Sequence, residues 1–398
     1  MTQPHAPMIA IACGGTGGHL FPGLAVAEQL VKRGCSVTLL VSPKEVDQQA
    51  VKMARNVEIV TLPAVGLQNR NYFSFGRSFL KSWLAARDVF RKHKPAAALA
   101  MGGFTSAPPI LAAKRLGAKT FLHESNTIPG RANRWLSRFV DQCFVGFPQA
   151  ASKLRTRNAV TTGTPVRPQF HPRHAAACRV AIGLQADRPT ILVMGGSQGA
   201  SGINDLMVKA LPMIVAREPQ PQFFHLSGPG DVEKVRHAYA EKKVRAVVHG
   251  FFGDMELALG AATMAVSRSG ASSLAELAAV RVPSVLIPYP AATDNHQFYN
   301  AKAFQETDAA HLLNQKNATP ENLAKLILDL IANAVAREQM QLALAKWHAP
   351  QAAEQIAETM LKLIAHGTEY AGAKPNDAQG GCGCGGEHRA ELRAKTAA

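Results

Sequence analysis

The chain has 398 residues, 47% of them hydrophobic and 18% charged, which excludes a wholly disordered protein and predicts two domains of about 150 to 200 residues each. No apolar run reaches the roughly 20 residues that span a bilayer, and the N-terminus lacks a signal-peptide pattern, so we expect a cytoplasmic protein. Residues 1–165 hold 21 basic and 7 acidic side chains, hence +14 of the net charge of +16, which predicts an anionic partner for the first half: a membrane surface, a phosphorylated substrate or nucleic acid.

The first half alternates short apolar runs with helix-like patterns. Residues 8–12 lead through the glycine-rich stretch from Cys13 to His19 into a helical pattern, which predicts strand, glycine turn and helix. Further strands are expected at residues 36–41, 57–61, 97–101, 120–123 and 142–145. This alternation predicts a parallel, doubly wound sheet.

The same plan begins again after a turn-rich joint at residues 161–168. Residues 190–194 lead into the glycine-rich stretch 195–200 and a second helical pattern. Further strands are expected at residues 222–226, 246–249, 264–267 and 284–287, followed by amphipathic helices over residues 319–365. The fold class is therefore α/β, with two Rossmann-like parallel-sheet domains that face each other across a cleft.

We place the domain boundaries at residues 1–164 and 165–366, followed by a disordered tail at 367–398. The last helix of the second domain is expected to pack back on the first. In the tail, Cys382 and Cys384 have no second ligand pair at zinc-finger distance, so we expect no metal site. The other four cysteines are scattered along the chain and are expected to be reduced and buried.

Two glycine turns that feed helix N-termini can hold phosphate through backbone N–H groups and the helix dipole. A dinucleotide site would also need a carboxylate after the second strand of each domain, where this chain has Ser42 and Ser227. The P-loop pattern is absent as well. NAD binding and kinase or ATPase chemistry are therefore disfavoured.

The second domain carries two dense polar stretches. One runs from Ser267 to Glu276 and joins the end of a strand to the start of a helix, where backbone amides suit a diphosphate. The cation of Arg268 could offset the charge on a departing diphosphate. Glu276 could accept hydrogen bonds from ribose hydroxyls. The other runs from Asp294 to Asn300, where carboxylate and amide groups suit sugar hydroxyls.

Seven ordered motifs between Met8 and Ile364 resemble one family. They are GGTGGHLFPGLAVAEQL, GGFTSAPPILAA, HESNTIPGRANRWL, GTPVR, GGSQGA, RSGASSLAEL and DNHQFYNA. They resemble the MurG family of peptidoglycan N-acetylglucosaminyltransferases, which belong to glycosyltransferase family 28. The resemblance implies a GT-B fold that transfers GlcNAc from UDP-GlcNAc to undecaprenyl-diphospho-MurNAc-pentapeptide (lipid I), giving lipid II.

The resemblance also implies which residues contact the donor UDP-GlcNAc. They are Thr16, Gly17, Gly18, Asn126, Arg167, Ser197, Phe252, Ala271, Ser272, Ser273, Leu274, Ala275, Glu276 and Gln297. Phe252 would meet the uracil through nearby backbone, with plain core packing as the alternative. Gln297 and Asn300 would hold the sugar, with helix capping as the competing interpretation.

The general base that deprotonates the acceptor 4-hydroxyl is expected to be His19, because an imidazole exchanges protons near neutral pH. Hydrogen bonding or capping by His19 is the alternative, and His123 with Glu124 forms a reserve pair. Catalysis would need no metal or other cofactor, since helix dipoles and Arg268 can stabilise the departing UDP in a single inverting displacement.

Acceptor contacts are expected from Gly102, Gly103, Phe104, His123 and Asn133. Gly102 and Gly103 could present amides to the acceptor diphosphate, with simple turn geometry as the alternative. Phe104 stands where the family has a tyrosine. A hydrogen bond from the tyrosine hydroxyl to the acceptor therefore cannot be essential in this chain.

A stretch of aromatic and cationic residues predicts peripheral binding to an anionic membrane, with a core helix as the alternative. Its residues are Phe75, Arg77, Phe79, Lys81 and Trp83. The implied location is the cytoplasmic face of the inner membrane, where cell-wall synthesis and division proteins are further possible partners. No helix combines regularly spaced cations with base-reading side chains, so nucleic acid is not an expected partner.

Three other functions stay open from the residues alone. A transferase could use another lipid acceptor such as diacylglycerol. A UDP-GlcNAc 2-epimerase shares the two-lobed plan but needs no membrane surface. A non-catalytic binding module is the third alternative.

Overall fold

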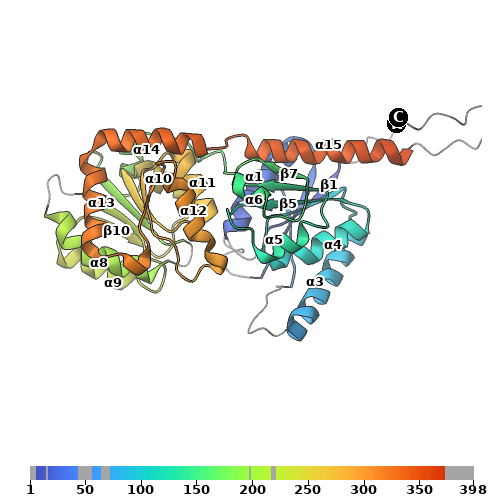
Figure 1. Ribbon diagram of the computed structural model, residues 1–398, viewed down its shortest axis with the longest axis horizontal. Helices are drawn as coiled ribbons and strands as arrows, with labels where there is room; N and C mark the ends of the chain where they lie inside the picture. The colour runs from blue at the N-terminus through green and yellow to red at the C-terminus, as the bar shows by residue number, and fades with distance from the viewer. Residues whose placement is uncertain are drawn as a thin grey trace, which may run out of the picture.

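The molecule consists of two lobes, each built on one parallel sheet (Figure 1). The computed structural model describes residues 6–14, 17–43, 56–63, 72–196, 199–216 and 221–372. Within these residues, the N-terminal sheet has the strand order β3-β2-β1-β4-β5-β6-β7 and the C-terminal sheet the order β10-β9-β8-β11-β12-β13. All the described pairings are parallel. The predicted pair of Rossmann-like domains is confirmed.

The N-terminal lobe begins each βα unit with a short buried strand. Its strands are β1 (Met8–Ala12), β2 (Ser36–Val41), β3 (Glu58–Thr61), β4 (Ala97–Ala100), β5 (Lys119–Glu124), β6 (Gln142–Val145) and β7 (Ala159–Thr161). Its helices are α1 (Gly17–Lys32), α3 (Tyr72–Lys92), the 3-10 turn η1 (Phe104–Ser106), α4 (Ala107–Arg115), α5 (Arg131–Leu136) and α6 (Pro148–Ala151).

The C-terminal lobe repeats the plan with longer helices. Its strands are β8 (Thr190–Met194), β9 (Gln222–Leu226), β10 (Ala246–His249), β11 (Met264–Ser267), β12 (Ser284–Leu286) and β13 (His311–Leu312). Its helices are α7 (Ala175–Ala181), α8 (Ser201–Val215), α9 (Val232–Glu241), α10 (Met255–Ala261), α11 (Ala271–Val280), α12 (His296–Gln305), α13 (Pro320–Ala332) and α14 (Ala334–Trp347), with 3-10 turns η2 (Thr293–Asn295) and η3 (Gln315–Asn317).

The central strands are buried on both faces, as parallel strands covered by helices must be. Every residue of β8 is buried, and Ile9 and Ile11 of β1 are fully buried beneath α1. This explains why these strands read as continuous apolar runs in the sequence. Among the described residues, the free cysteines Cys13, Cys35, Cys143 and Cys178 are buried, as expected.

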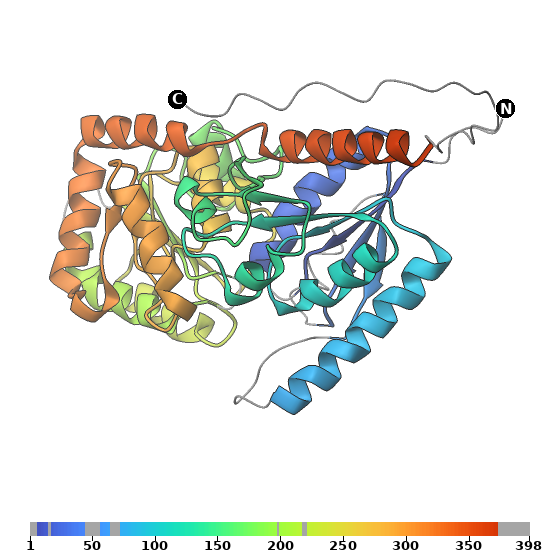
Figure 2. The ribbon, with the colours of Figure 1, turned by 45° about the vertical axis from the view of Figure 1, so that its right-hand side comes forward.

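The last helix, α15 (Ala352–Gly372), leaves the C-terminal lobe and lies along the N-terminal one (Figures 1 and 2). Ile356, Ala357 and Met360 are fully buried in the core beneath α1. At the rim of this contact, Arg33 pairs with Glu354 and with Glu358 at 2.8 and 3.2 Å. This helix extends to Gly372, beyond the domain end predicted at residue 366. The segment with Cys382 and Cys384 lies outside the described residues.

Each sheet has its topological switch point beside its first strand, between β1 and β4 and between β8 and β11. In open parallel sheets, ligands bind outside the carboxyl ends of the strands at such a point. The described residues that follow these strands are 13–14, 17–18, 101–104, 195–196, 199–200 and 268–271. All the glycine motifs singled out in the sequence therefore lie where this fold binds ligands.

Within the described residues, no helix has both the length and the apolar character needed to cross a membrane.

Candidate active site

The two turns at the N-terminal switch point are tied together by a hydrogen bond. Thr105 Oγ1 donates to the Gly14 carbonyl at 2.7 Å, and Ser106 Oγ donates to the Gly103 carbonyl at 2.8 Å. A Cβ at Gly14 would lie 2.4 Å from the Ser42 amide nitrogen, so only glycine fits between β1 and β2. Packing within the protein, as well as any bound ligand, therefore determines the conformation of these two turns.

His19 lies in the first turn of α1, directly against Gly102. A Cβ at Gly102 would lie 2.7 Å from His19 Cε1, and the backbone there has φ +121°. Gly103 follows with φ +79°, and its own Cβ position is 3.7 Å from the far side of the same ring. The glycine pair thus accommodates the imidazole, which the sequence alone did not indicate.

The Glu124 carboxylate organises the loop that follows β5. One oxygen accepts from the amide and the side-chain nitrogen of Asn126, at 2.8 and 3.0 Å. The other accepts from the Gly130 amide at 2.9 Å and from Asn133 Nδ2 at 2.7 Å. Four donors saturate a carboxylate. We therefore remove Glu124 from the candidate bases, because deprotonating an acceptor would require this loop to come apart.

His123 is fully buried at the end of β5. Its Nε2 lies 3.0 Å from the Gly163 carbonyl, to which it can only donate, and Nδ1 then accepts from Ser125 Oγ at 3.2 Å. Burial lowers its pKa to about 4, the Gly163 bond acts in the opposite direction, and nearby His19 lowers it slightly further. A neutral ring with both nitrogens used cannot contact the acceptor, so that expectation is corrected.

Asn133 is buried beside Gly102, and its amide orientation is fixed because Nδ2 must face the Glu124 carboxylate. Its Oδ1 is buried and has no hydrogen-bond partner in the described part of the chain. An unsatisfied buried acceptor costs free energy. Asn133 therefore remains a candidate to receive a hydrogen bond from the acceptor.

Asn300 joins the two lobes instead of facing a sugar. This fully buried side chain of α12 accepts from the amide and hydroxyl of Thr127, both at 2.9 Å. Its Nδ2 donates to Asn126 Oδ1 at 3.0 Å and to the Ser269 carbonyl at 3.2 Å. All its bonding capacity is used, so the expectation that Asn300 holds the donor sugar is corrected. A continuous hydrogen-bonded chain runs from Glu124 in one lobe to Ser269 in the other.

Helices α1 and α11 meet where the lobes come together. Ser272 Oγ, in the first turn of α11, donates to the Gly18 carbonyl in the first turn of α1 at 2.8 Å. The first N–H groups of both helices have no intrahelical acceptors. Of the predicted donor contacts, Gly17, Gly18 and residues 271–276 thus converge, whereas Thr16 and Ser197 lie outside the described residues.

Arg268, buried just after β11, supports the loop that follows β12. Its Nη1 lies 2.9 Å from the Ile287 carbonyl, 3.0 Å from the Pro288 carbonyl and 2.7 Å from Gln315 Oε1. The guanidinium also lies over the Tyr289 ring, 5.5 Å from its centroid. Burial lowers its pKa to about 10, so it stays charged at neutral pH. Gln315 is a neighbour that no sequence motif indicated.

One hydrogen bond orients the side-chain amide of Gln297 and leaves its Nε2 as an unused donor among the described residues. Its Oε1 accepts from the Tyr289 amide at 2.9 Å, while Ser269 Oγ holds its carbonyl at 2.8 Å. Within the described residues Nε2 has no acceptor, so it can donate to a sugar hydroxyl. The preceding Asp294 has φ +50° and Asn295 φ +55°, and Asp294 is held by Arg131 and Arg134 of the other lobe at 3.1 and 2.8 Å.

Glu276 lies half-buried on α11, and burial raises its pKa to about 7. Arg167 opposes that rise in pKa and Glu256 adds to it. Arg167 itself is buried between the rings of Phe21 and Phe170, 4.6 and 5.1 Å from their centroids. The positive charge of Arg167 is therefore near enough to Glu276 to favour the ionised carboxylate, although burial outweighs this effect.

Phe252 packs against Phe224 and His249, with ring centroids 5.0 and 5.5 Å away. Its ring belongs to the rim of the core, which favours the alternative of packing. The adjacent Phe251 is 48% exposed.

The predicted membrane stretch forms the first half of α3, which projects from the N-terminal lobe (Figures 1 and 2). Phe75 packs on Phe79 and edge-on against Phe104, with centroid distances of 6.1 and 5.5 Å. Phe79 and Trp83 border the core, while Arg77 and Lys81 are exposed. The exposed apolar side chains of this helix are instead Phe73, at 86%, and Leu80, at 55%.

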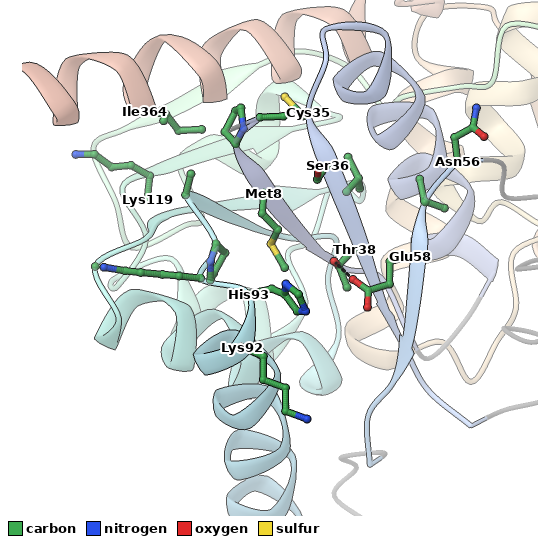
Figure 3. Close-up of a pocket in the computed structure, with 18 residues that line it drawn as sticks. Met8, Cys35, Ser36, Thr38, Asn56, Glu58, Lys92, His93, Lys119 and Ile364 are labelled. Atoms are coloured by element: carbon green, nitrogen blue, oxygen red, sulfur yellow. Dashed lines mark hydrogen bonds between the residues drawn. The ribbon is translucent and has the colours of Figure 1, made fainter. Parts of the chain in front are cut away.

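A large cavity of about 1510 Å³ lies at the opposite end of the N-terminal sheet (Figure 3). It is lined by the first residues of strands, such as Met8, Ser36 and Glu58, and by Lys92 and Lys119. These are the amino ends of the strands, so the cavity lies away from the switch point where this fold binds ligands. The residues brought together between the lobes are the better candidate for chemistry.

Comparison with known proteins shows the family of the chain. Residues 9–145 match the glycosyltransferase family 28 N-terminal domain, and residues 190–356 match the family 28 C-terminal domain. A curated relative from Anaeromyxobacter sp. (strain Fw109-5) is 34% identical over 359 residues, 89% of this chain and 93% of its own length. It is named a UDP-N-acetylglucosamine–N-acetylmuramyl-(pentapeptide) pyrophosphoryl-undecaprenol N-acetylglucosamine transferase.

Two solved structures resemble about nine-tenths of the chain. MurG of Acinetobacter baumannii has a TM-score of 0.70 and 29% identity, covering 89% of this chain and 99% of that one. A putative UDP-N-acetylglucosamine 2-epimerase from Listeria monocytogenes has a TM-score of 0.66 and 17% identity, covering 92% and 97%. The second likeness concerns the fold alone.

Proposed function

Because this chain belongs to glycosyltransferase family 28, in the MurG group, we propose that it transfers GlcNAc from UDP-GlcNAc to the lipid-linked MurNAc-pentapeptide lipid I, forming lipid II. It is a hexosyltransferase. The substrate assignment rests on the similarity to relatives named as this transferase. The contact of α1 with α11 through Ser272 and Gly18 supports it, because it brings the proposed donor and acceptor regions of the two lobes together. The epimerase alternative has only a shared fold in its favour.

The donor is proposed to bind with its diphosphate at the helix N-termini of the C-terminal lobe. The first amides of α8 and α11 are oriented donors, and such helix ends favour anions. Glu276 would accept from the ribose hydroxyls, and Gln297 Nε2 would donate to the sugar. Thr16, Gly17, Gly18, Asn126, Arg167, Ser197 and residues 271–276 complete the proposed donor contacts, and Phe252 contributes through its neighbouring backbone.

The acceptor is proposed to bind against Gly102, Gly103, Phe104 and Asn133, with His19 as the general base. Removal of Glu124 and His123 as alternatives strengthens this choice, since their hydrogen-bonding groups are fully used. The attack would be a single inverting displacement: the acceptor oxygen forms a bond to the anomeric carbon, His19 takes the proton, and UDP departs with the electron pair of the broken bond. Arg268 and the helix dipoles offset the charge that develops on UDP.

The lipid substrate requires contact with a bilayer, and α3 is the proposed point of contact. Phe73 and Leu80 lie on one exposed face beside Arg77 and Lys81, which suits rings at headgroup depth and cations on lipid phosphates. Cytoplasmic leaflets are the anionic ones. We therefore propose peripheral binding at the cytoplasmic face of the inner membrane, where other cell-wall synthesis and division proteins are possible partners.

Incubation of the purified protein with UDP-GlcNAc and lipid I tests the function. We expect UDP and a disaccharide-lipid product whose new linkage is β. Formation of UDP-ManNAc, or of a glycosylated diacylglycerol in a parallel incubation, would contradict the proposal. Replacing His19 by Ala should lower turnover at saturating donor by more than about tenfold.

A further inference from the structure

Gln315 lies in the 3-10 turn after β13, outside both glycine turns and outside every motif of the sequence. It is half-buried and contacts the first turn of α8. A Cβ at Gly202, the second residue of that helix, would lie 2.6 Å from Gln315 Nε2. The absence of a side chain at Gly202 therefore makes room for this amide.

The orientation of the Gln315 amide is determined by Arg268. A guanidinium can only donate, so the group 2.7 Å from Arg268 Nη1 must be the amide oxygen. The amide nitrogen consequently faces the start of α8. Among the described residues, Gln315 Nε2 has no acceptor, so two N–H donors remain available at that helix end.

The start of α8 presents further donors in the same direction. Ala200 is the N-cap, and its carbonyl accepts from Ile203 and Asn204 at 2.8 and 2.9 Å. The amides of Ser201 and Gly202 precede these bonds and belong to the unpaired first turn. A side-chain amide beside them adds a donor at the place proposed for the diphosphate, with buried Arg268 directly behind it.

We infer that Gln315 binds the diphosphate of the sugar nucleotide through Nε2, and that Arg268 acts in part as a positioning residue that holds this amide in its binding orientation. The role rests on the proposed donor position at α8. Arg268 thereby contributes to donor binding in two ways: through its charge, and through the group it orients.

Uridine and UDP differ by the diphosphate, so comparing them isolates this contact. We propose isothermal titration of UDP and of uridine into the wild type, Gln315→Ala and Gln315→Glu. Losing a hydrogen bond to a charged group should weaken UDP binding by about tenfold to a hundredfold in Gln315→Ala, and a carboxylate should weaken it further by repulsion. Uridine binding should change less than about twofold in both variants.

Gln305→Glu serves as the matched control, because it introduces the same charge at an exposed position at the end of α12. It should leave UDP and uridine binding unchanged. Gly202→Ala gives an independent test, since its methyl group displaces the Gln315 amide, and it should also weaken UDP selectively.

Equal losses for UDP and uridine, or unchanged UDP binding in Gln315→Ala and Gly202→Ala, would overturn the inference. Failure of the wild type to bind UDP would instead overturn the proposed function.

Discussion

Gly102 leaves room for the imidazole of His19, and this pair allows a test of the proposed base. Gly102→Ala places a methyl group where the imidazole lies, so we expect a fall in kcat of more than about tenfold. Gly117→Ala is the matched control, because it also has positive φ, +86°, but opens into free space. The backbone strain of Gly117→Ala is about 1 to 2 kcal/mol. Gly102→Ala costs more, because its φ of +121° lies beyond the left-handed region and its methyl group meets His19.

Steady-state kinetics and thermal denaturation of the two variants separate the effects. Both variants are expected to fold, with the larger loss of stability in Gly102→Ala and the loss of kcat confined to that variant. Equal kcat values in the two variants would show that the position of His19 does not limit turnover.

Glu276 makes both stability and donor binding depend on pH. Burial raises its pKa from 4.5 to about 7, so the folded protein holds a proton that the unfolded chain has lost between these values. Its contribution to stability therefore declines as pH rises from about 4.5 to 7. We expect Glu276→Gln to be more stable than wild type at pH 8, with the difference shrinking towards pH 5.

Thermal denaturation across that pH range measures the stability difference between wild type and Glu276→Gln. In the wild type, UDP binding should also strengthen as pH rises through 7, because the carboxylate is the better acceptor for ribose hydroxyls. A pH profile of UDP affinity that is the same in Glu276→Gln and in wild type would contradict the assigned contact.

Polar residues show most clearly what sequence reasoning could not determine. Asn300 has the residue type of a sugar ligand and Glu124 that of a base, which is why the sequence predicts both of them as site residues. Their partners are other protein groups, and those of Asn300 are remote in sequence: Thr127 lies 173 positions away. Residue type gives hydrogen-bonding capacity, but only tertiary structure tells whether the protein has already used it.

At the level of elements, the central strands were predictable; of the four edge strands, β3 and β10 were predicted and β7 and β13 were missed. The strands β1, β2 and β6 match their expected bounds, because burial on both faces leaves an unmistakable apolar run. The missed strands β7 and β13 are short and at sheet edges, with little buried surface to mark them.

Helix α3 was predicted as an aromatic and cationic stretch; in the structure Phe79 and Trp83 border the core, whereas the exposed apolar side chains are Phe73 and Leu80. We therefore expect replacement of Phe73 and Leu80 by Ser to reduce binding to anionic vesicles by about tenfold or more, since each loses an apolar contact with the bilayer. The melting temperature should stay unchanged. Phe75→Ala, by contrast, should lower the melting temperature because Phe75 packs on Phe104.

Co-sedimentation with vesicles checks this assignment. Val335 and Leu342 provide the control, because they have the same sequence spacing and are 63% and 61% exposed on α14 of the other lobe. Their replacement by Ser should not alter vesicle binding. An equal loss from both pairs would indicate non-specific apolar adsorption.

At the scale of the whole molecule, the C-terminal helix makes the lobes interdependent. Ile356 is fully buried in the N-terminal core although it belongs to the last helix. We expect Ile356→Ala to destabilise the protein by about 2 to 5 kcal/mol, the cost of a core cavity. Chemical denaturation measures this loss, and a change below about 1 kcal/mol would mean that α15 is not part of the N-terminal core.

The chain connects the two lobes at two places, and these two connections are in contact. Gly163 in the first and Ala349 in the second are so close that a methyl group at Gly163 would overlap the Ala349 side chain. Because these two connections are in contact at one point, the lobes can rotate about that point more easily than one lobe can shift past the other. A rotation of one lobe about this contact would keep the two connections together but would break the hydrogen bonds from Thr127 to Asn300, which hold the lobes to each other elsewhere.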